Sequence, residues 1–229
     1  MKILSYLKSK LFAFYLFWAF LAILISFIGG GGLTNDKITH LIIIFIGLFS
    51  FVILNLFKVK NPKLFFISSS VFLASLVEGA YMISRPVFKD LLVPENASLG
   101  LFINNWFIDL CFTIPAYIFI FSTIWWLINR YSFSKREYFF WFALGQALSD
   151  GFAFFLSAPA FILLVPYVML NYHAMNFLPF LAIQDSLQNK PRKETYWKYP
   201  IVIISIWVVY MISGITIKMV GHSLGFVSF

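Results

Sequence analysis

The chain has 229 residues, of which 61% are hydrophobic and only 11% are charged, and its mean hydropathy is +0.88. Roughly a quarter of the residues of a soluble domain are charged, so this composition excludes an ordinary soluble enzyme and indicates an all-α polytopic membrane protein. The formal net charge of +8 is concentrated in short connectors between apolar stretches, which argues against nucleic-acid binding.

Seven apolar stretches are each near the ~20 residues that cross a bilayer, and we predict that all seven are transmembrane helices. In chain order they cover residues 11–29, 39–57, 64–84, 101–128, 139–157, 158–181 and 200–222. The fifth and sixth are divided at Ser157-Ala158-Pro159, because residues 139–181 are too many for one crossing. The first stretch lacks a small-residue cleavage site and is interpreted as a retained span rather than a signal peptide.

Basic residues alternate between the ends of these stretches. They gather at residues 2–10, 58–63, 130–136 and 190–198, whereas the intervening connectors are poor in net positive charge. This positive-inside pattern predicts an integral membrane protein with its N-terminus in the cytoplasm and its C-terminus outside. The membrane would be the endoplasmic reticulum in a eukaryote or the inner membrane in a bacterium.

Three carboxylates fall inside the apolar stretches, namely Glu78, Asp109 and Asp150. A carboxylate in hydrocarbon costs several kcal/mol unless it faces the protein interior and finds a partner there. With a rise of ~1.5 Å per helical residue, all three lie about 17–21 Å from the predicted cytoplasmic face. We therefore expect them to line one intramembrane cavity.

Polar side chains accompany the carboxylates, several of them at spacings of three or four residues that place them on the same helix faces. They are Tyr81 near Glu78, Asn105 near Asp109, Gln146 near Asp150, and Asn171 and His173 in the sixth stretch. One alternative is that such groups only join helices, at ~0.6 kcal/mol each. A proton path along the carboxylates is another alternative.

Several short motifs occur in a recognisable order along the chain. They are Leu76-Val77-Glu78-Gly79, Phe88-Lys89-Asp90-Leu91, Asp109-x-x-Phe112-x-x-Pro115, Gly145-Gln146-Ala147-Leu148-Ser149-Asp150 with Phe155-Leu156, and Leu178-Pro179 followed by Asp185-Ser186. Together they resemble the EXPERA superfamily, which includes sterol Δ8–Δ7 isomerases of the emopamil-binding type and the sigma-2 receptor. One departure is Ala74, which stands where the isomerases carry a His that acts with the Glu.

The resemblance implies a five-helix EXPERA-like core over residues 39–188, formed by the second to sixth spans. Residues 1–38 would add an N-terminal helix with a Gly-rich turn, and residues 189–229 a basic loop with a C-terminal helix. The family's ligands are sterol-like or other polycyclic and cationic amphiphilic molecules, so such a lipid is the expected partner. Oligomeric state does not follow from the sequence.

The residues themselves suggest how a ring double bond could be isomerised by proton transfer. Burial can keep Glu78 or Asp109 protonated as the acid, and the other carboxylate or His173 could accept a proton. Tyr81 or Trp106 could face a carbocation through cation–π attraction. No cofactor or metal is expected, because the three His residues are scattered. A non-enzymatic lipid-binding protein and a small-molecule or proton-coupled transporter are the alternatives.

Overall fold

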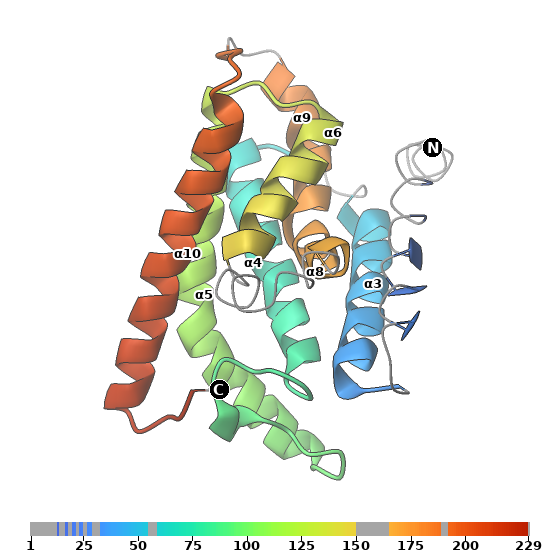
Figure 1. The fold of residues 1–229 in the computed structure, drawn as a ribbon, viewed down its shortest axis with the longest axis vertical. Coiled ribbons are helices and arrows are strands. Elements are labelled where there is room, and N and C mark those ends of the chain that lie inside the picture. Colours follow the sequence, from blue (N-terminus) through green and yellow to red (C-terminus); the bar gives the residue numbers. More distant parts are fainter. Residues whose placement is uncertain are drawn as a thin grey trace.

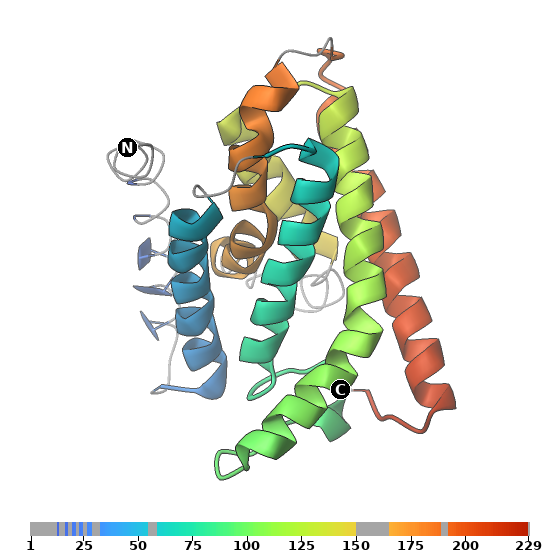
Figure 2. The same ribbon diagram turned by 180° about the vertical axis from the view of Figure 1, so that it is seen from behind.

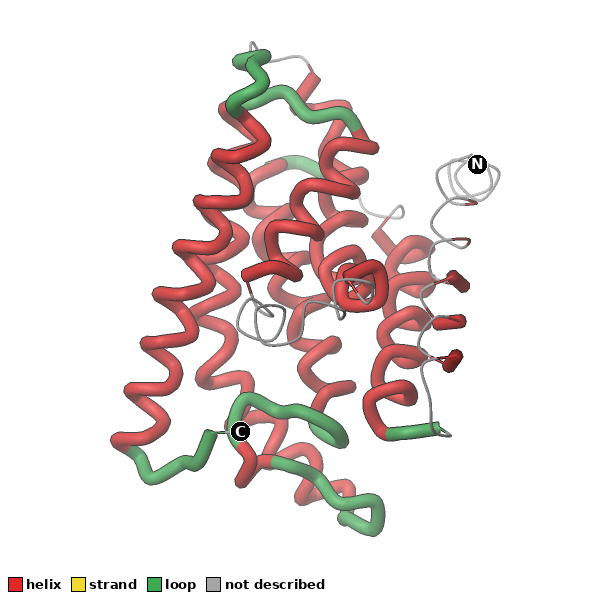
Figure 3. Tube along the Cα trace, viewed as in Figure 1, coloured by secondary structure: helices red, strands yellow, loops and turns green. Residues whose placement is uncertain are grey.

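The protein is seen here as a computed structural model that describes residues 33–54, 59–149, 165–188 and 192–228, with single positions between residues 13 and 28. Within these ranges the secondary structure is helical, and the helices pack side by side into one elongated bundle (Figures 1 and 3). The all-helical class predicted from the sequence is confirmed for this part of the chain.

The helices follow one another through short connectors. Their bounds are α3 Asn35–Leu54, α4 Pro62–Tyr81, η1 Lys89–Leu91, α5 Leu99–Arg130, α6 Lys135–Glu137, η2 Tyr138–Phe142, α8 Val165–Tyr172, η4 His173–Phe177, α9 Leu178–Gln188 and α10 Lys198–Ser223. The π-helical turn η2 continues as an α-helix over residues 143–149, and η4 joins α8 to α9 in one helical run.

Local sequence signals explain where the long helices begin. The Asn61 side chain caps α4 by accepting the Leu64 N–H. Pro62 follows at the first helical position and has no backbone N–H, so it leaves no donor unsatisfied there. Ser98 caps α5 in the same way by accepting the Leu101 N–H at 3.2 Å. Ser134 and Glu137 form a reciprocal capping box that starts α6.

Helix α4 occupies the middle of the bundle and packs against α5, α3, η4 and α9. Helix α10 lies along α5, as the views from both sides show (Figures 1 and 2), and also packs against η2. The predicted extra C-terminal helix is therefore part of the same bundle as the predicted core.

Three of the described helices, α4, α5 and α10, are long and apolar enough to cross a membrane. They correspond to the predicted third, fourth and seventh spans, and the count of seven spans stays a prediction. Most of the predicted first span and the division at Ser157-Ala158-Pro159 lie outside the described residues. Helix α5 has 32 residues, about 48 Å at the helical rise, so it is longer than a ~30 Å hydrocarbon layer if it stands upright.

The helix that contains the end of the predicted sixth stretch extends beyond residue 181, through Gln188. This extension is an amphipathic segment. Ile183, Gln184 and Leu187 are buried in the bundle, whereas Asp185 is exposed. Residues 182–188 therefore pack through one face without being apolar throughout.

The connectors gather at two ends of the bundle. At what we call the loop end (residues 82–98 and 221–228), Lys89 N–H donates to the Val227 carbonyl at 2.9 Å. At the basic end (residues 129–137 and 192–199), Lys193 N–H donates to the Arg130 carbonyl at 2.9 Å. The third connector and the C-terminal segment thus share one end, and the fourth and sixth connectors share the other, as the charge pattern predicted. Which end faces the cytoplasm stays a prediction.

Candidate functional site

The contact between α4 and α5 holds the first of the predicted carboxylates. Glu78, half-buried on α4, accepts a hydrogen bond from the Tyr117 hydroxyl on α5. One turn earlier on α4, the Ser75 carbonyl accepts the Trp106 indole N–H at 3.0 Å. The indole also lies against Gly79, where an added Cβ would be 3.1 Å from the ring. A carboxylate, a phenol and an indole therefore meet at one interface between two helices that can cross a membrane.

Asp109 belongs to a different set of contacts. It is completely buried, and its Oδ1 accepts the Val87 N–H at 2.8 Å. One turn before it, Asn105 donates from Nδ2 to the Leu91 carbonyl at 3.2 Å. Both side chains thus fasten the connector between α4 and α5 onto the start of α5. The second oxygen, Oδ2, is buried and has no hydrogen-bond partner among the described residues.

Gln146 lies in a buried polar network that joins three segments. Its Oε1 accepts the Asn176 Nδ2–H at 3.0 Å and the Tyr210 hydroxyl at 3.3 Å, while its Nε2 donates to the Phe142 carbonyl at 3.0 Å. Asn176 Oδ1 in turn accepts the Tyr138 hydroxyl at 2.7 Å. The described hydrogen bonds of the Gln146 side chain lie within this network, whereas the Asn105 amide donates to the connector.

Two π-helical turns, η2 and η4, face each other beside this network. His173 of η4 stacks on Phe139 of η2 with ring centroids 3.8 Å apart, and its Nε2 lies 2.9 Å from the Phe139 carbonyl. A carbonyl can only accept, so Nε2 carries the proton in this contact. At the end of η2, the Ala143 N–H bonds to the Phe140 carbonyl three residues back, a 3₁₀-type contact. His173 here joins two helices.

Asn171 and Tyr81 form a further contact between α8 and α4, in which the Asn171 amide donates to the Tyr81 hydroxyl. The Tyr81 ring also meets His40 of α3 edge-on, at 6.0 Å between ring centroids. Asp150 lies outside the described residues, so its predicted place beside Gln146 stays a prediction. The described candidates are thus spread over separate contacts: Glu78–Tyr117, Trp106–Ser75, Asp109–Val87, Asn105–Leu91, Gln146–Asn176, His173–Phe139 and Asn171–Tyr81.

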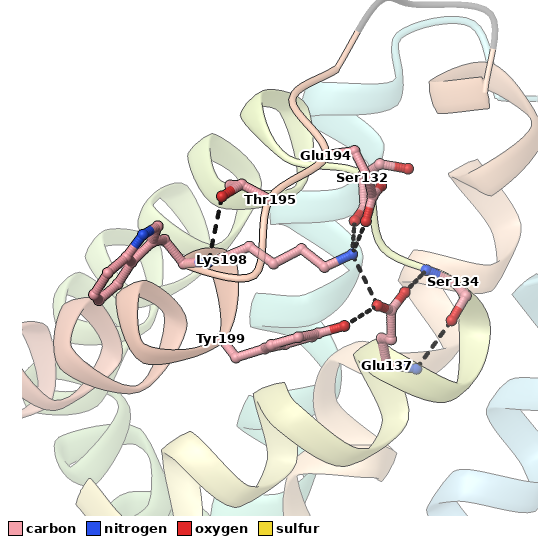
Figure 4. Close-up of polar contacts among 8 residues, drawn as sticks. Ser132, Ser134, Glu137, Glu194, Thr195, Lys198 and Tyr199 are labelled. Atoms are coloured by element: carbon pink, nitrogen blue, oxygen red, sulfur yellow. Dashed lines mark hydrogen bonds and ion pairs between the residues drawn. The ribbon is translucent and has the colours of Figure 1, made fainter.

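The densest charged cluster within the described part of the chain was not expected from the sequence. Lys198, with a side chain only 2% exposed, donates from Nζ to Glu194 at 2.6 Å, to the Ser132 carbonyl at 2.7 Å and to Glu137 at 2.8 Å. Figure 4 shows the ammonium group between these three acceptors, which match its three N–H donors. Tyr199 adds a 2.5 Å hydrogen bond to Glu137.

This cluster controls the charge of Glu137. Partial burial raises the pKa of the Glu137 carboxyl, but hydrogen bonds from Lys198, Tyr199 and Ser134 outweigh burial and lower the pKa to about 2. Glu137 is thus ionised at neutral pH and pairs with a buried ammonium. The cluster ties the start of α10 to α6 at the basic end.

Sequence signals existed for the residues that were missed. Tyr117 continues the four-residue spacing of Asn105, Asp109 and Thr113, so it lies on the same face of α5. Asn176 follows His173 by three residues inside an apolar stretch, and Glu194 precedes Lys198 by four.

Comparisons of the chain with protein-family models, curated proteins and solved structures found no match.

Proposed function

We propose that the chain is an integral membrane protein that binds a bulky apolar molecule carrying a cation at the α4–α5 contact around Glu78. The observation that carries this proposal is the carboxylate of Glu78, half-buried between two apolar helices and bonded to Tyr117. A carboxylate at such a place is costly unless it serves a function or meets partners inside the protein, and Glu78 meets Tyr117 at this helix contact.

The neighbouring aromatic side chains favour a cationic amphiphile over a simple lipid. Trp106, whose indole lies against Gly79, and Tyr117, which bonds Glu78, are both partly exposed. An ammonium group placed there would gain from the carboxylate and from the aromatic faces together. The resemblance to the EXPERA superfamily supplies the ligand class, namely sterol-like and amphiphilic molecules, and that assignment is part of the proposal.

We limit the proposal to binding, without isomerisation. Shifting a ring double bond needs an acid and a base at one ligand. Ala74, one turn before Glu78, is buried and supplies no such group, while Asp109 Oδ1 is engaged by the connector. Membranes containing the protein should therefore leave a Δ8-sterol unchanged, and formation of the Δ7 product would refute this limit.

The binding experiment measures the affinities of two ligands, a tertiary-amine amphiphile and a neutral sterol, for two variants of the protein. Glu78→Gln nearly keeps the side-chain shape but removes the charge, so it should weaken a tertiary-amine amphiphile by about 1.5–3 kcal/mol, the range for hydrogen bonds to charged groups. Binding of a neutral sterol should change little. Glu95→Gln, at an exposed position in the connector after α4, is the matched control and should alter neither affinity.

Two results would overturn the proposal. Equal losses for the amine and the neutral sterol in Glu78→Gln would show that the carboxylate only supports the helix contact. Absence of binding of both ligands to the wild-type protein in mild detergent would remove the ligand site itself.

A further inference from the structure

An open depression of about 510 Å³ lies at the basic end, lined by Asn129, Arg130, Arg192 and Lys193. Among the described residues that line it, Arg130, Arg192 and Lys193 are cationic, and they come from two segments far apart in the chain, the end of α5 and the connector before α10. A depression of this size is large enough for a small polar group with its first water molecules.

The backbone holds these cations in a fixed arrangement. Residues 130–132 and 193 run side by side, with Lys193 N–H donating to the Arg130 carbonyl at 2.9 Å and Ser132 N–H donating to the Lys193 carbonyl at 3.0 Å. Arg192 Nη1 reaches the Ile128 carbonyl at 3.4 Å. Carbonyls at the last turn of α5 are thus occupied by donors, which reduces the negative potential that a helix C-terminus would present to an anion.

The carboxylate that follows Lys193 in the chain pairs with another cation. Glu194 follows Lys193 directly, but its Oε1 lies 2.6 Å from the Lys198 ammonium. Partial burial lowers the pKa of the Arg192 guanidinium and Glu194 raises it, so Glu194 offsets part of the cost of holding this cation. The depression therefore keeps an excess of positive charge that faces solvent.

Aromatic side chains place the depression at the level of a membrane interface. The Arg130 guanidinium lies 5.4 Å from the Trp126 ring, and Trp126 is 48% exposed on the apolar surface of α5. Tyr196 and Trp197, in the connector just beyond Lys193, are 89% and 73% exposed. Exposed Trp and Tyr next to basic residues mark the headgroup region of a bilayer.

We infer that this depression binds the phosphate group of an anionic phospholipid, whose acyl chains lie along the exposed apolar face of α5. Arg130 and Arg192 supply guanidinium forks that match phosphate oxygens, Lys193 adds an ammonium, and the Asn129 amide can donate a further hydrogen bond. The contact of Arg130 with an exposed Trp on a membrane-spanning helix favours a lipid over a free phosphate ion.

The test measures lipid affinity by native mass spectrometry of the full-length protein in mild detergent. Phosphatidylglycerol should bind at least about tenfold more tightly than zwitterionic phosphatidylcholine. Each cation near an anionic headgroup contributes about a factor of five to the affinity. The double variant Arg130→Gln, Lys193→Gln should therefore bind phosphatidylglycerol about tenfold or more weakly than the wild type. Both changes leave the backbone bonds of this segment intact, and an unchanged melting temperature would confirm that the variant folds.

Lys63→Gln is the matched control, because Lys63 is exposed in the first turn of α4 and lies outside the depression. A loss in this control equal to that of the double variant would overturn the site and leave only a general attraction of basic loops. Equal binding of the two lipids by the wild type would also overturn it. Displacement of phosphatidylglycerol by millimolar inorganic phosphate would overturn the assignment to a lipid.

Discussion

At the basic end, the ammonium group of Lys198 donates hydrogen bonds to two carboxylates and a carbonyl. At the loop end, the Oδ1 atom of Asp109 accepts one backbone N–H, whereas its Oδ2 atom has no hydrogen-bond partner among the described residues. The basic end lies outside the predicted spans, where charges can be matched by other charges and by water. Asp109 lies inside a helix that can cross a membrane.

At the loop end, aromatic packing adds to the hydrogen bonds that Asp109 and Asn105 make to the connector. Phe88 is buried between Phe112 and Phe226, with ring centroids 4.9 and 5.2 Å away, and its ring fills the space left by Gly221. The two ends of the bundle are thus held by different sets of contacts. We therefore expect them to respond differently to the loss of a charged side chain, to an added side-chain atom and to a change of pH.

The largest expected effect is at the basic end. Lys198→Met keeps most of the side-chain volume but leaves Glu137 and Glu194 without their shared ammonium. Breaking a buried ion pair typically costs 3–5 kcal/mol, and because both carboxylates keep contact with water we expect about 3 kcal/mol or less. Chemical unfolding in detergent micelles would measure this loss of free energy.

Lys218→Met is the control for this prediction, because Lys218 lies on the same helix and is exposed. It should leave the free energy of unfolding nearly unchanged. Equal stability of Lys198→Met and the wild type would show that the cluster contributes no net stability and that packing closes both ends.

The next effect concerns space at the loop end. A Cβ at Gly221 would lie 1.9 Å from the Phe88 ring, and that ring is held by two neighbouring Phe side chains, so Gly221→Ala should destabilise the protein by about 1–3 kcal/mol. Gly214→Ala, on the same helix with no atom within 4 Å of the added Cβ, should not destabilise it. A harmless Gly221→Ala in thermal unfolding would mean that Phe88 moves aside freely.

These contacts show how far the sequence alone can lead. Hydropathy and connector charge predicted an all-helical bundle and the shared ends of its connectors, because both depend on composition over many residues. The polar stripe of Asn105 and Asp109 was also visible, since helical spacing fixes which residues share a face.

The partners of those side chains were not predictable in the same way. Asp109 Oδ1 meets the backbone of Val87, and Gln146 meets Asn176, because connector geometry and two facing π-turns bring them together. Equal depth in the membrane says nothing about rotation around a helix axis. The shared cavity of Glu78, Asp109 and Asp150 consequently stays a prediction.

Two substitutions of Asp109 should have smaller effects, and comparing them shows whether the hydrogen bond or the negative charge of Asp109 matters for stability. Asp109→Asn keeps an oxygen to accept the Val87 N–H, so it should cost less than about 1 kcal/mol. Asp109→Leu leaves that partly buried N–H without this acceptor and should cost about 1–3 kcal/mol. Unfolding free energies of the two variants would test this order. If Asp109→Asn were as damaging as Asp109→Leu, the negative charge and not the hydrogen bond would be what the loop end needs.

The smallest effect is the pH dependence of the basic end. The pKa of Glu137 is lowered from 4.5 to about 2 in the folded protein, so its contribution is complete above about pH 4.5 and is lost as pH falls toward 2. The sign follows because the unfolded chain binds the proton more readily than the folded one over this range. Melting temperatures of the wild type should therefore fall between pH 4.5 and 2, and Glu137→Gln should make this fall smaller.

Glu95→Gln, exposed at the loop end, is the control and should show the same pH dependence of the melting temperature as the wild type. Parallel slopes for Glu137→Gln and the wild type would show that Lys198 is stabilised by Glu194 and the Ser132 carbonyl alone, and the contrast between the two ends would then rest on fewer charges.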